Sequence, residues 1–411
     1  MPTTIQNLAL LLGENFQIMQ DGFIGIDGGK ITCIGQGTPP HDETIALDGS
    51  GLVAIPGLID AHVHLGDSVA KDIGIGLGLD ALVHPIHGLK TKLLRESKED
   101  DICQAMAAAS YEMIGGGVTA FADFREGGLA GVKLELKALE KSRQRRIILG
   151  RPNYHFDRDE VVNESKLLTP QTIEELRQTI DLASGVGVSG PNEYTKSSLE
   201  QISDICKGKG KRLAIHAAES PEATKFSMEK FSVSEVHRAI HYLKPDFMVH
   251  LTNSSEEDLA ELSKNPIPVV CCPRANAILG LGFPSILELL EAGVTVALGT
   301  DNVMLNAPDM FREMDYTSRI LRAANRDAGV ISSKEILKMA TLNAAKALGI
   351  ASKVGSLGEG KTADIVFLDF RTPNLASSKD LIGSIVHRAN REDVRCVMVE
   401  GEVVHGNIPR L

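Results

Sequence analysis

Two histidines separated by one residue, His62 and His64, give the clearest chemical signal in the sequence. They follow an apolar run, residues 52–59, whose composition predicts a buried β-strand. Residues two apart on a strand project from the same face, so both imidazoles should point to one side. Paired imidazoles at a strand end suit a divalent metal ion, which histidine nitrogen binds at roughly 2.0–2.1 Å. The pair alone is equally compatible with an ordinary polar strand end.

Three further apolar runs end in a residue that can bind a metal. His216 and His250 each end one run, and Asp301 ends the run that starts at Val294. In parallel α/β barrels the loops after the strands form the active site, so these residues are expected to converge. Three histidines and one aspartate from different strands would hold one Zn²⁺ or Fe²⁺ and leave a position open for water.

Between these runs the sequence alternates strand and helix patterns. Helical segments such as 102–114, 134–143, 172–183 and 233–243 alternate with strands, among them a predicted strand at 118–124. The count is about eight strands, the number that closes a parallel barrel. The expected fold class is therefore α/β, with a (β/α)8 TIM barrel over residues 56–354.

Both ends of the chain have the pattern of short strands joined by turns. Residues 1–55 alternate apolar runs with glycine-containing turns, and residues 355–411 include a predicted tight hairpin at Glu400-Gly401. Chain termini usually lie close together, so we expect the two segments to build one small β-sandwich domain. The expected division is 1–55 and 355–411 for the sandwich and 56–354 for the barrel.

The composition narrows the classes of partner. Of 411 residues, 43% are hydrophobic and 24% charged, as in ordinary globular proteins. A net charge of −11 argues against binding of nucleic acid or anionic membranes. No apolar stretch reaches the roughly 20 residues of a membrane helix, and no basic segment precedes the short run 8–12. We expect a cytoplasmic protein with a small-molecule substrate; a homo-oligomer is possible. The six cysteines include no Cys-x-x-Cys pair, which favours reduced thiols.

Taken together, the motifs resemble those of the amidohydrolase superfamily of metal-dependent barrel hydrolases. The matching segments follow the family's order over nearly the whole chain: Pro56-Gly57-Leu58-Ile59-Asp60-Ala61-His62-Val63-His64, His216, His250, Gly299-Thr300-Asp301 and residues 355–366. His216-Ala217-Ala218-Glu219 is similar to the His-x-x-Glu of the branch that contains cytosine deaminase and chlorohydrolase-like enzymes. This resemblance implies one metal ion, Zn²⁺ before Fe²⁺ or Mn²⁺, with four ligands: His62, His64, His216 and Asp301.

The resemblance also implies roles for two further residues and for Asp301. His250 would contact the water or the developing oxyanion, Glu219 would carry a proton to a ring nitrogen, and Asp301 would accept and return a proton. The expected enzyme is a mononuclear aminohydrolase that deaminates a purine, pyrimidine or nucleoside-like heterocycle with a metal-activated water. The alternatives are purely structural roles: His250 would be a buried core residue, and Glu219 would cap a helix.

Two other readings of the same scaffold stay open. The enzyme could hydrolyse a cyclic amide or imidazolone bond, or a chloro- or alkylamino-substituted ring. The third hypothesis is a non-catalytic scaffold.

Binuclear members of the superfamily bridge two metals with a lysine at the end of strand four. Residues 186–190 contain no lysine, which favours one metal, although Lys196 lies a little beyond.

The sequence offers only weak candidates for substrate contacts. A glycine-rich loop after the first histidine pair carries His84, His87 and Lys90, which could bind a carboxylate or phosphate; a solvated loop is equally compatible. Arg274, in a Cys-Pro-x-x-Asn segment, could clamp an anionic or carbonyl group or form an exposed salt bridge. Asn302, directly after the last expected ligand, is a further candidate.

Overall fold

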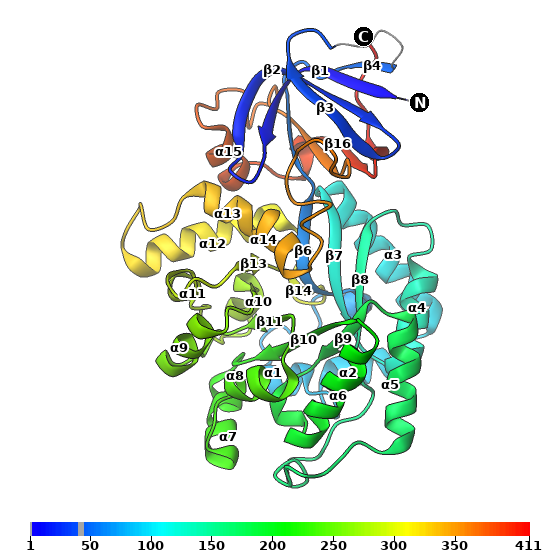
Figure 1. Cartoon of the computed structure of the whole chain (residues 1–411), viewed down its shortest axis with the longest axis vertical. Coiled ribbons are helices and arrows are strands. Elements are labelled where there is room, and N and C mark those ends of the chain that lie inside the picture. Colours follow the sequence, from blue (N-terminus) through cyan, green and yellow to red (C-terminus); the bar gives the residue numbers. More distant parts are fainter. Residues whose placement is uncertain (1, 40–44) are drawn as a thin grey trace.

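The computed structural model describes residues 2–39 and 45–411 (Figure 1). Two β-sheets organise the chain: a sheet built from both chain termini, and a parallel sheet surrounded by helices. Residues 1 and 40–44 of the predicted N-terminal β-region lie outside the described residues.

The parallel sheet has nine strands, and every pairing between neighbours is parallel. Its spatial order is β13 (Val296–Leu298), β12 (Val269–Cys271), β11 (Phe247–His250), β10 (Arg212–Ala217), β9 (Gly185–Val188), β8 (Arg145–Gly150), β7 (Val118–Arg125), β6 (Leu58–His64) and β14 (Asp301–Asn302). Only Gly299 and Thr300 separate β13 from β14, so the two ends of this order adjoin and the sheet is curled. A Cβ at Gly299 would lie 2.8 Å from the His62 backbone nitrogen, so a side chain there would prevent this approach. The result is an α/β fold consistent with the expected barrel.

Helices follow most of the parallel strands and cover the outside of the sheet (Figure 1). They are α3 (Glu99–Gly115), α4 (Gly128–Ala138), α5 (Pro170–Leu182), α6 (Lys196–Gly208), α7 (Pro221–Phe231), α8 (Glu235–Arg238), the π-helix η3 (Ala239–Leu243), α9 (Glu256–Lys264), α10 (Pro273–Ile278), α11 (Ile286–Glu291), α12 (Met310–Asn325), α13 (Ser333–Met339) and α14 (Leu342–Ala347). Shorter elements lie in the loops: η1 (Leu65–Ala70), α1 (Leu79–Val83), α2 (Leu89–Glu96) and η2 (Pro191–Glu193). The strands of the sheet are buried because helices face them on the outer side.

The second sheet interleaves strands from the two ends of the chain. Its order is β17 (Glu402–Gly406), β16 (Val394–Val399), β15 (Ile365–Asp369), β5 (Leu52–Pro56), β1 (Thr3–Leu12), β2 (Gln17–Asp27) and β3 (Lys30–Gln36), with β4 (Ile45–Asp48) also paired to β1. The helices α15 (Leu381–His387) and η4 (Arg391–Asp393) lie between β15 and β16. The predicted hairpin at Glu400-Gly401 is present, with both residues at positive φ (51° and 75°).

Two details of the predicted elements are wrong. The apolar run that was expected to form one strand into His62 divides at Gly57, because β5 pairs within the terminal sheet and β6 within the parallel sheet. The helix predicted at 134–143 is α4 at Gly128–Ala138, since the chain already turns into a helix after Gly127, which has φ of 84°.

Within residues 2–39 and 45–411, no helix has the length and apolar character needed to cross a membrane.

Candidate active site

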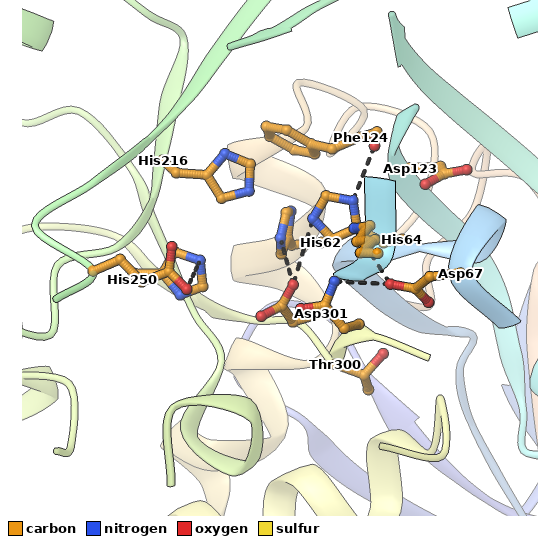
Figure 2. Close-up of polar contacts among 12 residues, drawn as sticks. His62, His64, Asp67, Asp123, Phe124, His216, His250, Thr300 and Asp301 are labelled. Atoms are coloured by element: carbon orange, nitrogen blue, oxygen red, sulfur yellow. Dashed lines mark hydrogen bonds and ion pairs between the residues drawn. The ribbon is translucent and has the colours of Figure 1, made fainter. Parts of the chain in front are cut away.

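Four histidine rings lie together at the carboxyl ends of β6, β10 and β11 (Figure 2). The ring centroid of His62 is 4.9 Å from those of His64 and His216 and 5.7 Å from that of His250. All four residues are buried, and the ring of Phe124 packs 4.5 Å from that of His62. The strand ends therefore bring these side chains together although the chain separates them by up to 188 residues, from position 62 to 250.

Backbone carbonyls orient two of the rings. Nδ1 of His64 lies 3.0 Å from the carbonyl oxygen of Phe124, and Nδ1 of His216 lies 3.0 Å from that of Val188. A carbonyl can only accept, so each Nδ1 must carry the hydrogen. The Nε2 lone pairs of His64 and His216 are then available to the cluster, which is the arrangement that metal-binding histidines use.

His250 has the opposite arrangement. Its Nδ1 lies 3.3 Å from Nδ2 of Asn276, and an amide NH₂ donates, so Nδ1 must be the acceptor. The ring hydrogen of His250 is then on Nε2, which lies 3.5 Å from the Glu219 carboxylate. His250 is therefore a hydrogen-bond donor to the cavity, in contrast to His64 and His216.

Asp301 completes the cluster from β14, the strand paired with β6. Its Oδ1 lies 3.2 Å from Nε2 of His62 and 3.5 Å from Nε2 of His64. Its Oδ2 is buried and has no hydrogen-bond partner among the described residues. Burial opposes ionisation of this carboxyl, but the hydrogen bond from His62 and the neighbouring imidazoles outweigh burial and lower its pKa. Asp301 is thus a carboxylate with one free oxygen.

At His64, the Glu126 and Asp301 carboxylates outweigh burial and raise the pKa. At His62 and His216, burial favours the neutral imidazole. It lowers the pKa of His62 to about 3 and places the pKa of His216 well below its usual value. A neutral imidazole has a lone pair to share, and an imidazolium does not. The cluster is therefore a set of nitrogen and oxygen donors.

The backbone at the strand ends is strained. Ala218, His250 and Asp301 have φ of 47°, 77° and 64°, in the left-handed region that residues with side chains seldom adopt. Such strain costs on the order of 1–3 kcal/mol per residue and is concentrated at functional sites. Asp60 supports the region, because its carboxylate accepts hydrogen bonds from the hydroxyl (2.5 Å) and backbone N–H (3.0 Å) of Thr300.

Glu219 lies beside this cluster, immediately after β10. Its carboxylate, with His250 and Asp301, offers three ligand atoms within 4.8 Å of one another. Burial raises the pKa of the Glu219 carboxyl. The alternative of a helix cap does not apply, because the side chain of Ser220 caps α7 by accepting from the N–H of Ala223.

A cavity of about 1140 Å³ opens above these residues. His84 and His87 line it with their rings stacked, 3.6 Å between centroids, and His87 is exposed. Asn302 also lines the cavity, and its amide donates to Asp67 at 2.8 Å. These three predicted contact residues therefore reach the cavity.

Lys90 reaches the cavity wall, but its ammonium group is already paired. Nζ lies 2.5 Å from a carboxylate oxygen of Glu126 and 3.3 Å from one of Asp67, and Lys90 is only 4% exposed. Burial alone would lower its pKa, but the two carboxylates outweigh burial and raise it. The same Glu126 oxygen lies 2.9 Å from Nδ1 of His64. This geometry suits the support of His64 better than the capture of an anionic substrate.

Arg274 and Lys196 are directed elsewhere. The guanidinium group of Arg274 lies 3.5 Å from the buried Glu313 carboxylate and donates to the carbonyl of Ala307. The ammonium group of Lys196 lies over the ring of Tyr242, 5.0 Å from its centroid. Neither is among the described residues that line the cavity.

Several cavity residues were not identified from the sequence. Arg151 and His155 line the cavity, as does Glu235, which is buried and accepts a hydrogen bond from the N–H of Ala218. Arg151 directly follows β8, so its position after a strand end was an available signal. Glu235 begins a helix, and nothing in its local sequence points to the site.

The curled parallel sheet and its cluster of nitrogen and oxygen donors define a class: α/β proteins with a polar site at the carboxyl ends of their strands. A model of the amidohydrolase family matches residues 53–404, and this chain belongs to that family.

Similar proteins and solved structures are consistent with this family assignment. A putative aminohydrolase of Methanothermobacter thermautotrophicus is 34% identical, covering 97% of this chain and 98% of its own length. A 5-methylthioadenosine/S-adenosylhomocysteine deaminase of Thermoanaerobacter pseudethanolicus is 30% identical, covering 98% and 93%. The structure of the zinc-bound atrazine chlorohydrolase of Arthrobacter aurescens superposes with a TM-score of 0.86 over 100% of this chain and 96% of its own, at 20% identity. That structural match concerns the fold alone.

Proposed function

We propose that this protein is a mononuclear, metal-dependent aminohydrolase that deaminates an aminated heterocycle of the purine, pyrimidine or nucleoside kind. One observation carries the proposal: Glu219 and the Nε2–H of His250 lie together beside the cluster of imidazoles and the oxygen of Asp301 that has no partner among the described residues. The similarity to a deaminase and an aminohydrolase over nearly the full length supports it.

The donor set fits a divalent metal ion. His62, His64, His216 and Asp301 would hold it. Donor atoms of His62, His64 and Asp301 lie within 4.8 Å of one another, and so do those of His62, His216 and His250, while Oδ2 of Asp301 is buried without a partner among the described residues. Borderline ligands of this kind favour Zn²⁺ and also accept Fe²⁺ or Mn²⁺. When bound, the ion supplies Lewis acidity, which lowers the pKa of a coordinated water from 15.7 to about 7.

The remaining chemistry falls to the protein's own side chains. Glu219, whose pKa burial raises, holds a proton at neutral pH more readily than an exposed glutamate and can deliver it to a ring nitrogen. His250 Nε2–H can donate to the oxygen that becomes negatively charged during attack. Asp301 can take a proton on the carboxylate oxygen that does not hold the ion and return it to the leaving ammonia. Phe124 and the surrounding buried residues exclude water from the base of the cavity.

The proposal extends to the wider organisation of the chain. The parallel sheet is the core of a (β/α)8 barrel at residues 56–354, and segments 1–55 and 355–411 form a β-sandwich. We further propose a cytoplasmic enzyme that acts on a small molecule, with no nucleic-acid or membrane partner. The net charge of −11 supports this view.

A substrate panel tests the proposal. Zinc-loaded protein is incubated with aminated bases, nucleosides and triazines, with cyclic amides and with chloro-substituted rings, while ammonia, ring opening and chloride are measured. Ammonia release from an aminated ring is expected, and Glu219→Gln should retain zinc while losing about 10²–10⁴-fold in kcat/KM.

Glu222→Gln is the matched control, since Glu222 also lines the cavity but is exposed, and it should stay near wild type. Ring opening or chloride release without ammonia would replace the deaminase assignment by the corresponding hydrolase. Full activity of Glu219→Gln would remove Glu219 from the reaction.

A further inference from the structure

A second cluster of metal-binding side chains lies on the helical layer, outside the cavity lining. His237 and His241 are four residues apart on the continuous helical segment formed by α8 and η3, and Glu261 lies on the neighbouring helix α9. One donor atom from each residue lies within 4.8 Å of the other two. None of the three is among the residues that line the cavity.

The Glu261 carboxylate is shared by both imidazoles. One oxygen lies 3.2 Å from Nδ1 of His237, and the other contacts Nε2 of His241. Two ligand atoms that bind one ion at about 2.1 Å with tetrahedral angles are themselves roughly 3.4 Å apart. The 3.2 Å between His237 and Glu261 is close to this value, and all three donor atoms lie within 4.8 Å of one another, so small side-chain rotations would bring them onto a common ion.

The two helices hold the three side chains in register. The hydroxyl of Ser234, the N-cap of α8, bonds to the carboxylate of Asp258 in α9, and it also accepts from the N–H of His237. Asp258 in turn completes a capping box with Ser255 at the start of α9. Glu261 is one helical turn after Asp258, so it faces the segment that carries both histidines. The cluster is thus fixed before any ligand arrives.

Solvent can reach this cluster. The side chains of His237 and His241 are 35% and 46% exposed, and that of Glu261 is 21% exposed. The adjacent Arg238 does not compete for the carboxylate, because it is buried and pairs with Glu164. A dissolved ion can therefore enter without unfolding either helix.

We propose that His237, His241 and Glu261 bind a second divalent cation of the zinc class, with solvent completing its coordination. Two imidazoles and one carboxylate suit Zn²⁺, Co²⁺ or Ni²⁺ better than Mg²⁺ or Ca²⁺, which prefer oxygen ligands. The ion joins α8 to α9. Because Glu235 of α8 accepts from the N–H of Ala218, this joint also stabilises the support of the strand end beside Glu219.

A different group, Asp80, His84 and His87, also offers three donor atoms at the cavity rim. This group is less suited to bind a metal ion, because Asp80 already pairs with Arg158 and Nδ1 of His84 accepts from the backbone N–H of Ile86.

Equilibrium dialysis against dilute Zn²⁺, followed by metal analysis, tests the second site in the full chain. The variant His237→Gln/His241→Gln should hold one zinc ion fewer than wild type, and Glu261→Gln should show the same loss. His387→Gln is the matched control, since His387 pairs with the Asp315 carboxylate and, within residues 2–39 and 45–411, belongs to no group of three possible metal ligands. It should keep the wild-type zinc content.

Two further measurements make the result decisive. Zn²⁺ should raise the Tm of His216→Gln, in which the candidate active site is impaired, and should not raise it when His237→Gln/His241→Gln is added. Equal zinc content in wild type and the double variant, with correct folding shown by circular dichroism, would overturn the inference. Failure of the proposed function gives a different result. In that case His237→Gln/His241→Gln would still lower the zinc content by one ion, whereas His216→Gln would leave the zinc content unchanged.

Discussion

At the scale of single residues, three of the four clustered histidines divide into two kinds by the hydrogen bonds of their Nδ1 atoms. Carbonyl partners put the ring hydrogens of His64 and His216 on Nδ1, whereas the Asn276 amide puts that of His250 on Nε2. Chemically identical side chains can therefore serve as electron-pair donors or as a hydrogen-bond donor. The difference is set by neighbours far away in the sequence.

Asn276→Asp tests this division. A carboxylate at position 276 would accept a hydrogen from Nδ1 of His250 and leave Nε2 as a lone pair facing Glu219. We expect kcat to fall by about 10²–10⁴-fold, as for other histidines held in the wrong tautomer, while zinc content is kept. Steady-state kinetics and metal analysis measure the two effects. Activity within a few-fold of wild type would show that the Asn276 contact does not control His250.

The sequence predicted the central donors and missed their partners for a physical reason. His62, His64, His216, His250 and Asp301 each end an apolar run, and parallel strands bring their carboxyl ends to one edge. The partners are fixed by packing. The Glu126 carboxylate contacts both His64 and Lys90, so the ammonium group of Lys90 is paired with Glu126 and is not free to bind a substrate. Such contacts leave no periodic signal along the chain.

At the scale of secondary structure, the break at Gly57 separates the two sheets. β5 and β6 are consecutive in sequence, and the apolar pattern runs through both, so the sequence predicted one strand. The pattern reports burial and cannot report which sheet buries each half. A Cβ at Gly57 would lie 2.0 Å from the hydroxyl of Thr119 in β7, so the junction passes too close to β7 for a side chain.

Gly57→Ala should destabilise the protein. Thr119 is buried, so the added methyl group must displace packed atoms, at a cost of about 1–3 kcal/mol. We expect a lower Tm by differential scanning calorimetry. Gly208→Ala is the control, because no atom lies within 4 Å of the position of its added Cβ near the end of α6, and its Tm should not fall. An equal Tm for Gly57→Ala and wild type would contradict the close packing.

Other elements show how far local patterns extend. The strand at residues 118–124 and the helix at 172–183 were predicted within two residues of β7 and α5, because strong apolar runs and clear capping signals define them. The helix at 134–143 was displaced, since its start depends on a left-handed glycine that can equally serve a loop.

At the scale of the whole molecule, the site lies where the curled sheet closes, at the junction of β13, β14 and β6. His62 and His64 come from β6, and Asp301 comes from β14, which pairs with β6. A metal ion held by these residues would fasten the point where the ends meet. The bound ion should therefore contribute to the stability of the complete fold as well as to activity.

Removal of the metal tests this link. Treatment with a chelator should abolish turnover and lower the Tm by several degrees. The buried ligand atoms lose the cation, and the folded state loses the free energy of metal binding. Zn²⁺ should restore both properties, and Mg²⁺ should not, since it prefers oxygen ligands. Loss of activity with an unchanged Tm would separate the ion from the closure of the sheet.

The interleaved terminal sheet has a consequence for synthesis on the ribosome. β5 pairs with β15, so β5 cannot complete its pairing until the ribosome has synthesised a strand about 310 residues later in the chain. At 5–20 residues per second this delay is roughly 15–60 s, during which the apolar edge of β5 is uncovered. The nascent polypeptide therefore presents an unpaired edge for most of its translation, and a chaperone that shields it should improve the yield of native product.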